Sequence, residues 1–268
     1  MINICVVSVF KNESHILKEW LEHYIKEEVD IFFLTDNGST DDYLPILEPY
    51  INSGKVVLNV NPKKYAQVEH LNFFLKKAKT YDWVIPIDLD EFVYARNGYN
   101  TIKEYLKDVK SDVHKIYIPW KLFGSSGHIK QPASVIQGFI HRRKFPKSTC
   151  HTCYDLLVDK KTIVRGKWLK KIGVHNSITE ETHIITPDNN DIMIDDFYHT
   201  NTEKKLQNSY LHLNHYRIQS LESFKKRITR GDAVKKKLNT VRNKKYFNFF
   251  DFKDMTDKEL RNKTYKKR

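Results

Sequence analysis

The stretch that decides the fold is WVIPIDLDEF, residues 83–92, in which an apolar run leads directly into an acidic cluster. The apolar part, residues 83–87, is typical of a buried strand. Asp88 and Asp90 follow two positions apart, so in an extended backbone their side chains leave the same face. Two neighbouring carboxylates repel each other unless a cation lies between them, and Mg²⁺ and Mn²⁺ prefer such oxygen ligands. The pattern therefore predicts a divalent-cation site at a strand end.

Apolar runs at 2–9, 31–35 and 56–60 precede this strand and are also typical of strands. Segments with helical periodicity separate them. Between the first two runs, apolar residues share one helix face at Ile16, Leu17, Trp20, Leu21, Tyr24 and Ile25. Strands that alternate with amphipathic helices form βαβ units. This part of the chain therefore predicts an α/β fold with a mostly parallel, Rossmann-like sheet flanked by helices.

The pattern changes after residue 110. Short apolar pieces at 116–120, 135–140 and 163–165 are separated by turns, which favours antiparallel strands and loops. Helical spacing returns at 220–230, and Gly231 is placed to end that helix. We expect this mixed half to complete the sheet and to form the second wall of a cleft.

Three polar clusters follow predicted strands: Lys11-Asn12-Glu13, residues 36–41 and residues 88–91. The carboxyl ends of parallel strands share one edge of a sheet, where α/β proteins bind their ligands. We therefore expect the three clusters to converge. The second cluster has two interpretations, because its residue types are ordinary in turns, whereas Asp36 could also accept hydrogen bonds from a ribose or a base.

The charge of the chain is distributed unevenly. The net charge is 46 − 33 = +13, and residues 225–268 carry 17 basic and 5 acidic side chains, a net of +12. The preceding 224 residues hold 29 basic and 28 acidic groups, so they are electrically balanced. A balanced body argues against a nucleic-acid footprint spread over the fold. The basic extension, residues 232–268, either keeps the protein soluble or docks on an anionic membrane or an acidic glycan.

The composition also bears on the compartment. A hydrophobic fraction of 40% excludes a wholly disordered chain, and three cysteines cannot form a disulfide framework. No apolar run approaches the roughly 20 residues that span a bilayer, and the start lacks the features of a signal peptide. We expect a cytoplasmic protein, with peripheral membrane contact through residues 232–268 as an open alternative.

Five motifs resemble those of glycosyltransferases with the GT-A fold, of the family-2-like and family-92-like types. In chain order they are VVSVFKNE at 6–13, TDNGSTD at 35–41, IDLDEF at 87–92, WKLFGSSGH at 120–128, and LNHYR at 213–217 with Ser220, Phe224, Lys226, Arg230 and Gly231. Each motif is weak alone, but all five occur in the family's order. The resemblance implies a GT-A domain over residues 1–231, followed by the basic extension 232–268.

The resemblance implies transfer of a sugar from a nucleotide-sugar, usually a UDP-sugar, to a hydroxyl of a glycan or another acceptor. It implies that Asp36 contacts the nucleotide, that Asp88 faces the ribose and the metal, and that Asp90 ligates Mn²⁺ or Mg²⁺. The metal would neutralise the departing diphosphate. The predicted nucleotide-sugar-binding set is Lys11, Asn12, Glu13, Asp36, Gly38, Asp88 and Asp90.

The remaining site candidates each have a structural alternative. His215 is a third metal ligand, beside Asp88 and Asp90, or a packed histidine, and Trp120 and Phe123 stack on an acceptor sugar or fill the core. An inverting enzyme also needs a base near the acceptor hydroxyl. The candidates, with Asp155 ranked first, are Asp155, His175, Glu180, Glu181 and Asp232. A retaining enzyme would need no such base.

Two other function classes remain open. A phosphotransferase or phosphatase could use an aspartate of the DLD motif as nucleophile, which trapping of an aspartyl-phosphate would reveal. That chemistry usually places the motif after the first strand, and here it follows the fourth. A nucleic-acid-binding module could act through the basic extension, and steep salt dependence would reveal it. We expect no nucleic-acid partner, because the D-x-D is intact.

Overall fold

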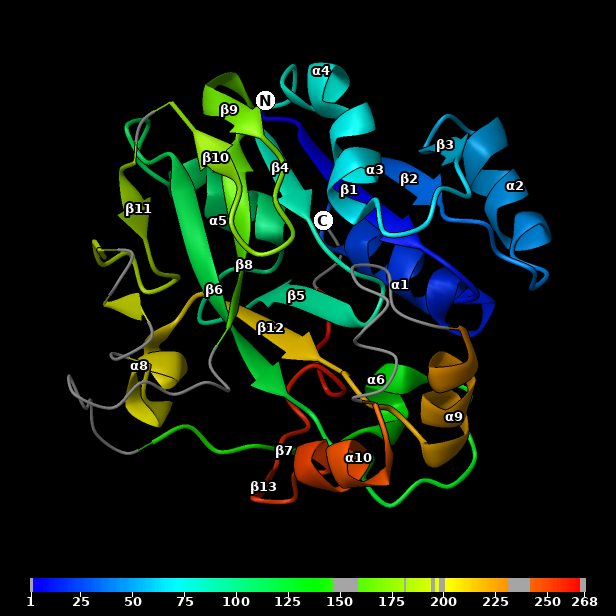
Figure 1. Ribbon diagram of the computed structural model, residues 1–268. Coiled ribbons are helices and arrows are strands. Elements are labelled where there is room, and N and C mark those ends of the chain that lie inside the picture. The colour runs from blue at the N-terminus through cyan, green and yellow to red at the C-terminus, as the bar shows by residue number, and fades with distance from the viewer. Residues whose placement is uncertain are drawn as a thin grey trace.

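The computed structural model describes residues 2–146, 159–180, 182–193, 196–197, 201–230 and 242–265. Its centre is a nine-stranded sheet of order β3-β2-β1-β4-β8-β6-β12-β5, with β11 beside β6. Helices flank this sheet, and the parallel half and the mixed half lie next to each other along it (Figure 1). The fold-class prediction is confirmed, since the parallel-then-mixed order is that expected of a GT-A fold.

The parallel half is built from alternating strands and helices, as the periodicity predicts. Its elements are β1 (Ile4–Phe10), α1 (Ser14–Lys26), β2 (Ile31–Asp36), α2 (Leu44–Asn52), β3 (Val56–Val60), α3 (Gln67–Phe73), α4 (Leu75–Ala78) and β4 (Trp83–Pro86). Strand β1 lies at its centre and pairs in parallel with both β2 and β4. The carboxyl ends of these strands therefore share one edge of the sheet.

Helices cover both faces of this half, which explains why β1 is apolar at every position except Ser8. Ile4 and Val6 belong to the core beneath α1 and α2, whereas Cys5 and Val7 belong to the core beneath α3 and α4. Alternate side chains of a strand point to opposite faces. The residues of β1 other than Ser8 are therefore apolar, because both faces of the sheet are buried.

The second half contains shorter elements. They are β5 (Glu91–Ala95), α5 (Ile102–Asp108), β6 (Lys115–Leu122), α6 (Val135–Gly138), β7 (His141–Arg142), β8 (Lys160–Arg165), η1 (Gly166–Trp168), β9 (Leu169–Lys171), β10 (Ile178–Thr179), β11 (Ile184–Ile185), α8 (Glu203–Asn208), β12 (Leu211–His215), α9 (Leu221–Arg230), α10 (Lys244–Phe250) and β13 (Met255–Thr256). Strand β8 runs antiparallel to both β4 and β6, so it joins the two halves.

One apolar piece differs from the expectation of strands. Residues 135–138 form the short helix α6, because the Ser134 side chain accepts a hydrogen bond from the backbone of Gln137 and caps the first turn. The Glu19 carboxylate of α1 accepts three further hydrogen bonds there, from Ser134 Oγ and from the backbone of Val135 and Ile136. A local cap and a contact from a distant helix therefore outweigh the β-branched composition.

The described part of the basic extension, residues 242–265, packs against the body. Strand β13 pairs with β7, and Phe247, Phe250 and Leu260 are buried in the main core. Phe247 and Phe250 of α10 therefore pack on the body of the protein. Residues 232–241 and 266–268 lie outside the described residues. Within the described ranges, no helix combines the length and the apolar character that a membrane span requires.

Candidate active site

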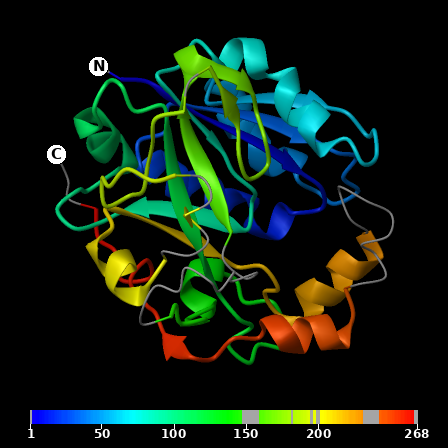
Figure 2. The ribbon, with the colours of Figure 1, turned by 60° about the vertical axis from the view of Figure 1, so that its left-hand side comes forward.

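A cleft of about 510 Å³ opens at the carboxyl edge of the parallel strands. Its first wall comes from the ends of β1 and β4, and its second wall comes from β12, α9, α10 and the segment before β10. The view in Figure 2 shows α9 and α10 side by side at the lower right, and the Phe224 and Phe247 rings pack between them at 5.1 Å. The cleft therefore lies where the two halves of the sheet meet.

Asp88 is held by a buried lysine. Its Oδ2 lies 2.6 Å from Lys161 Nζ, and Lys161 also bonds Glu91 Oε2 at 3.1 Å. Lys161 is 3% exposed and Glu91 is fully buried. Burial acts to lower the pKa of Lys161, but Asp88 and Glu91 outweigh it and leave that pKa raised. Lys161 is therefore a permanent cation behind the D-x-D.

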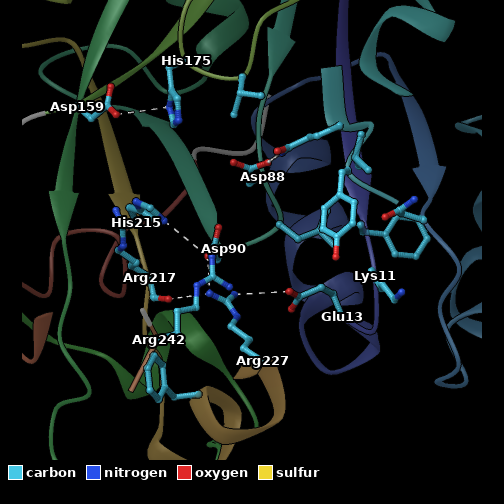
Figure 3. Close-up of a pocket in the computed structure, with 18 of the residues that line it drawn as sticks. Lys11, Glu13, Asp88, Asp90, Asp159, His175, His215, Arg217, Arg227 and Arg242 are labelled. Carbon is cyan, nitrogen blue, oxygen red and sulfur yellow. Dashed lines mark hydrogen bonds and ion pairs between the residues drawn. The ribbon is translucent and has the colours of Figure 1, made fainter. Parts of the chain in front are cut away.

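Asp90 is held by an arginine from the other wall. Arg227 Nη1 lies 2.9 Å from Asp90 Oδ2, and His215 Nε2 lies 3.6 Å from the same oxygen (Figure 3). Burial acts to raise the pKa of Asp90, yet Arg227 and His215 bring it well below its usual range. Arg227 also faces Glu13 at 3.6 Å and donates to the carbonyl of Arg217. Helix α9 is thereby tied to two of the strand-end clusters.

The side chains at Asp90 include an oxygen donor and a nitrogen donor of the types that bind divalent cations. Within the described ranges, no three His, Cys, Asp or Glu side chains converge closely enough to form a complete metal site. Asp90 and His215 nevertheless offer an oxygen and a nitrogen to the same space. Mg²⁺ and Mn²⁺ commonly take only one or two protein ligands and complete their shell with water and phosphate oxygens. The two side chains therefore fit such an ion.

Asp36 and Asn12 hold the loop beside the cleft and do not line it. Asp36 is 3% exposed, and its carboxylate accepts hydrogen bonds from the backbone of Ser39 and the hydroxyl of Tyr43. Burial, with Asp36 beside it, raises the pKa of Tyr43 to about 12. Asn12 Oδ1 accepts from the backbone of Thr40 at 2.6 Å.

Three other residues of these clusters reach the cleft: Lys11, Glu13 and Asn37. Asn37 was not among the predicted residues, although its place after the strand-ending Asp36 was a signal. Its side-chain amide donates to the carbonyls of Asn61 and Lys63, which fixes its orientation at the edge of the cleft. Gly38 has φ +73°, and a Cβ there would lie 3.1 Å from Pro62 Cβ, so the turn itself requires glycine.

The two aromatic candidates lie in different places. Trp120 lines the cleft between two histidines, with ring centroids 4.4 Å from His215 and 5.1 Å from His175. Phe123 is 1% exposed and packs on Tyr216 at 4.9 Å in the core, away from the cleft. Trp120 is therefore the one of the two that an acceptor could reach.

Among the candidate bases, His175 lines the cleft. Its Nδ1 lies 3.8 Å from Oδ2 of Asp159, which the sequence analysis had not singled out. Glu180 is exposed and is not part of the cleft wall. Asp155, Glu181 and Asp232 lie outside the described residues.

Comparison with known proteins identifies the family. The family model described as glycosyltransferase family 92 matches residues 1–264. The chain belongs to glycosyltransferase family 92. A family 92 protein of Ricinus communis is 24% identical over 238 residues, which cover 86% of this chain and 38% of that protein. One of Oryza sativa subsp. japonica is 27% identical over 150 residues, covering 54% and 26%. The chain thus spans less than half the length of these relatives.

Comparison with solved structures gives partial matches to this family 92 chain. TarS of S. aureus, residues 1–349, has a TM-score of 0.39 and 20% sequence identity, and the match covers 61% of this chain and 47% of that chain.

The second wall of the family 92 cleft carries three arginines, none of which is among the predicted site residues. Arg217, Arg227 and Arg242 all line it. Arg217 Nε donates to the hydroxyl of Tyr246 at 2.7 Å, and its guanidinium lies 4.5 Å from the centroid of the Phe250 ring. The segment that follows Gly231 therefore helps to build the cleft. Arg217 stands in a family motif, which was the one available signal.

Proposed function

We propose that this family 92 chain carries a catalytic domain that transfers a sugar from a UDP-sugar to a hydroxyl of a glycan or another acceptor. The observation that carries the proposal is the pairing of the D-x-D with cations from the opposite half. Asp88 meets Lys161 and Asp90 meets Arg227 at the open edge of a parallel sheet. Such a site can bind a diphosphate and neutralise it as it leaves.

The nucleoside end of the donor belongs on the first wall in this proposal. Phe10, Lys11, Asn37 and Tyr65 line that side of the cleft, and they offer aromatic faces, an amide and a cation. Asp36 supports the same side from below through Ser39 and Tyr43. In this proposal Asp36 affects nucleotide binding indirectly, by holding the loop that contains Ser39 and Tyr43.

The proposal includes Mn²⁺ or Mg²⁺ held by Asp90 and His215, with Asp88 next to it. When bound, the cation supplies positive charge to the diphosphate leaving group. Arg227 forms an ion pair with the Asp90 carboxylate in the structure. A cation that binds Asp90 therefore either replaces Arg227 or binds the carboxylate together with it. Lys161 remains behind Asp88 and keeps the buried Glu91 compensated.

A thermal-shift panel of UDP-sugars tests the proposal, because a ligand that binds only the native state raises its stability. We expect UDP-glucose, UDP-galactose or UDP-N-acetylglucosamine to raise the melting temperature, more with Mn²⁺ than with EDTA. Asp90→Asn should remove the Mn²⁺-dependent part. The matched control is Asp191→Asn, since that side chain is 83% exposed and outside the cleft. An unshifted melting temperature with every UDP-sugar would contradict the proposal.

Contact of residues 232–268 with an anionic membrane stays a prediction. Phe247 and Phe250 are buried, so membrane attraction would depend on the basic side chains and on Phe249, which is 59% exposed. Each Lys or Arg near such a surface adds about 1 kcal/mol, and salt screens the effect. Sedimentation with phosphatidylserine liposomes should therefore fall between low and high salt. The absence of sedimentation at low salt would exclude membrane docking.

A further inference from the structure

We propose that His175 and Asp159 form the proton-accepting pair of the transfer reaction, with His175 as the base and Asp159 as the residue that positions it. This inference rests on the proposed function and deepens it, because a base for the acceptor hydroxyl belongs to an inverting enzyme. Four features of the cleft support it: the loop that presents His175, the contacts of Asp159, the surrounding charges, and the place of the pair relative to the D-x-D.

The loop between β9 and β10, which carries His175, is fixed to the rest of the protein by hydrogen bonds. The side chain of Asn72 in α3 bonds both backbone groups of the buried Ile172, at 2.9 and 2.8 Å. A Cβ on Gly173 would lie 2.0 Å from the carbonyl oxygen of Asn176, so this turn closes only with glycine. Asn176 Oδ1 in turn accepts a hydrogen bond from Tyr117 of β6. Both sides of His175 are therefore anchored to the sheet.

Asp159 is oriented toward the imidazole by its own contacts. Its backbone carbonyl accepts from the backbone of Trp120, and its Oδ1 accepts from the backbone of Lys160 at 2.8 Å. Oδ2 faces His175 Nδ1 at 3.8 Å (Figure 3). Paired groups of this kind often stand slightly apart until substrate binds. With Nδ1 turned to the carboxylate, Nε2 is the nitrogen left to accept a proton.

The charges around His175 favour the neutral imidazole that a base must be. Burial lowers its pKa, and Lys161 of β8 and His215 of β12 lower it further. Asp159 and Asp88 act in the opposite direction, and the net pKa lies below the ordinary histidine value. Neutral His175 can therefore take a proton near pH 7, and Asp159 can stabilise the imidazolium that forms.

The pair lies across the cleft from the donor side. In Figure 3, His175 and Asp159 occupy one wall, while Glu13 and Lys11 occupy the other, with Asp88 and Asp90 between them. An acceptor hydroxyl that enters beside Trp120 gives its proton to His175 Nε2 as its oxygen bonds to the anomeric carbon. The bond from that carbon to the diphosphate breaks, and the diphosphate leaves with the electron pair. Attack opposite the leaving group inverts the anomeric centre.

Hydrolysis of UDP-sugars with water as acceptor tests the pair, because the natural acceptor is unidentified. We expect His175→Gln to lower kcat by about 10²–10⁴-fold while UDP still raises the melting temperature. Asp159→Asn should lower kcat less. It should also move the acid limb of the pH profile of kcat/KM to lower pH, because it removes a charge that raises the pKa of His175. His183→Gln is the matched control, since His183 bonds Asp191 outside the cleft.

Two further measurements bear on the pair directly. NMR of the first sugar released should show the anomer opposite to that of the donor. Nitrogen NMR of ¹⁵N-histidine protein should show His175 protonated at Nδ1, and this tautomer should be lost in Asp159→Asn. Retention of configuration, wild-type hydrolysis by His175→Gln, or a proton on Nε2 would each overturn the pair. Failure of wild-type protein to bind any UDP-sugar would instead overturn the proposed function itself.

Discussion

The parallel half of the molecule supplies the D-x-D carboxylates of the cleft, and the C-terminal half supplies the cations that pair with them. The parallel half supplies Asp88 and Asp90 directly after strand β4, where a local pattern marks them. Their cations come from elsewhere: Lys161 lies in β8, and Arg227 lies in α9. The comparison teaches that the position of the two carboxylates follows from the local sequence after a strand. The cations that neutralise them come from residues far apart in the sequence.

Removal of residues 242–268 should have the largest effect, and that effect should be on the stability of the whole fold. We infer that this segment belongs to the same folding unit as the body, because Phe247, Phe250 and Leu260 are buried in its core. The deletion also removes Asp257, which lies 2.9 Å from the fully buried Lys121. An uncompensated buried charge alone costs about 3–5 kcal/mol. We expect loss of cooperative unfolding in circular dichroism.

Lys253→Ala is the control for the deletion, since the Lys253 side chain is 63% exposed and an ion pair at the surface contributes at most about 1 kcal/mol. It should unfold close to the wild-type midpoint. A deleted protein that keeps a sharp transition at the wild-type temperature would show that residues 242–268 do not belong to the folding unit of the body.

Glu27 is a second junction between the halves, and it predicts a pH dependence. Its buried carboxylate lies 3.2 Å from Lys263 Nζ and accepts from the hydroxyl of Tyr265. Burial raises the pKa of Glu27 to about 7, although Lys263 and Tyr265 oppose this. Because the folded pKa lies above the unfolded value near 4.5, the native state holds the proton more tightly. This contribution to stability is complete below pH 4.5 and is lost as the pH rises through 7.

Glu27→Gln should flatten this dependence, which amounts to about 3 kcal/mol for a shift of this size. The measurement is the free energy of unfolding in urea at pH 5, 6, 7 and 8, for the variant and for wild type. Glu48→Gln, on the exposed side of α2, is the control. Parallel pH profiles for Glu27→Gln and wild type would count against a raised pKa at this position.

Arg227→Gln should have the smallest of the three effects, a change in the affinity for Mn²⁺. Arg227 holds Asp90 at 2.9 Å in the structure, so its loss should free that carboxylate for a divalent cation. We expect Mn²⁺ to bind about tenfold more tightly in the absence of nucleotide, which corresponds to about 1.4 kcal/mol. Electron paramagnetic resonance of free Mn²⁺ measures this binding without any turnover.

Lys226→Gln is the matched control for Arg227, because its exposed side chain pairs only with Glu222 of the same helix among the contacts described. Arg227→Lys keeps a cation and serves as the conservative variant, with Mn²⁺ affinity close to wild type. Equal or weaker Mn²⁺ binding by Arg227→Gln would indicate that Arg227 and the metal do not compete.

Much of the parallel half could be predicted from the sequence. Its strands have apolar runs because both faces are buried, and its helices have one apolar stripe. The position of Asp88 and Asp90 follows from the same pattern. The sequence pattern does not predict whether a given side chain at a strand end lines the cleft. Asp36 and Asn37 are neighbours in the chain, and of the two only Asn37 reaches the cleft. That choice depends on how the turn closes on Ser39 and Tyr43.

The sequence by itself determined the strands and helices of the parallel half and the acidic residues that follow β4, since each depends on residues close together in the chain. The family followed from five motifs in the expected order along the chain. Only the tertiary structure decided which cations meet that edge and which groups surround His175. Strand β8 lies between β4 and β6, and its long-range pairing brings Lys161 to Asp88 and the preceding Asp159 to His175. Burial then selects these partners, because a charge in the interior is stable only beside its opposite.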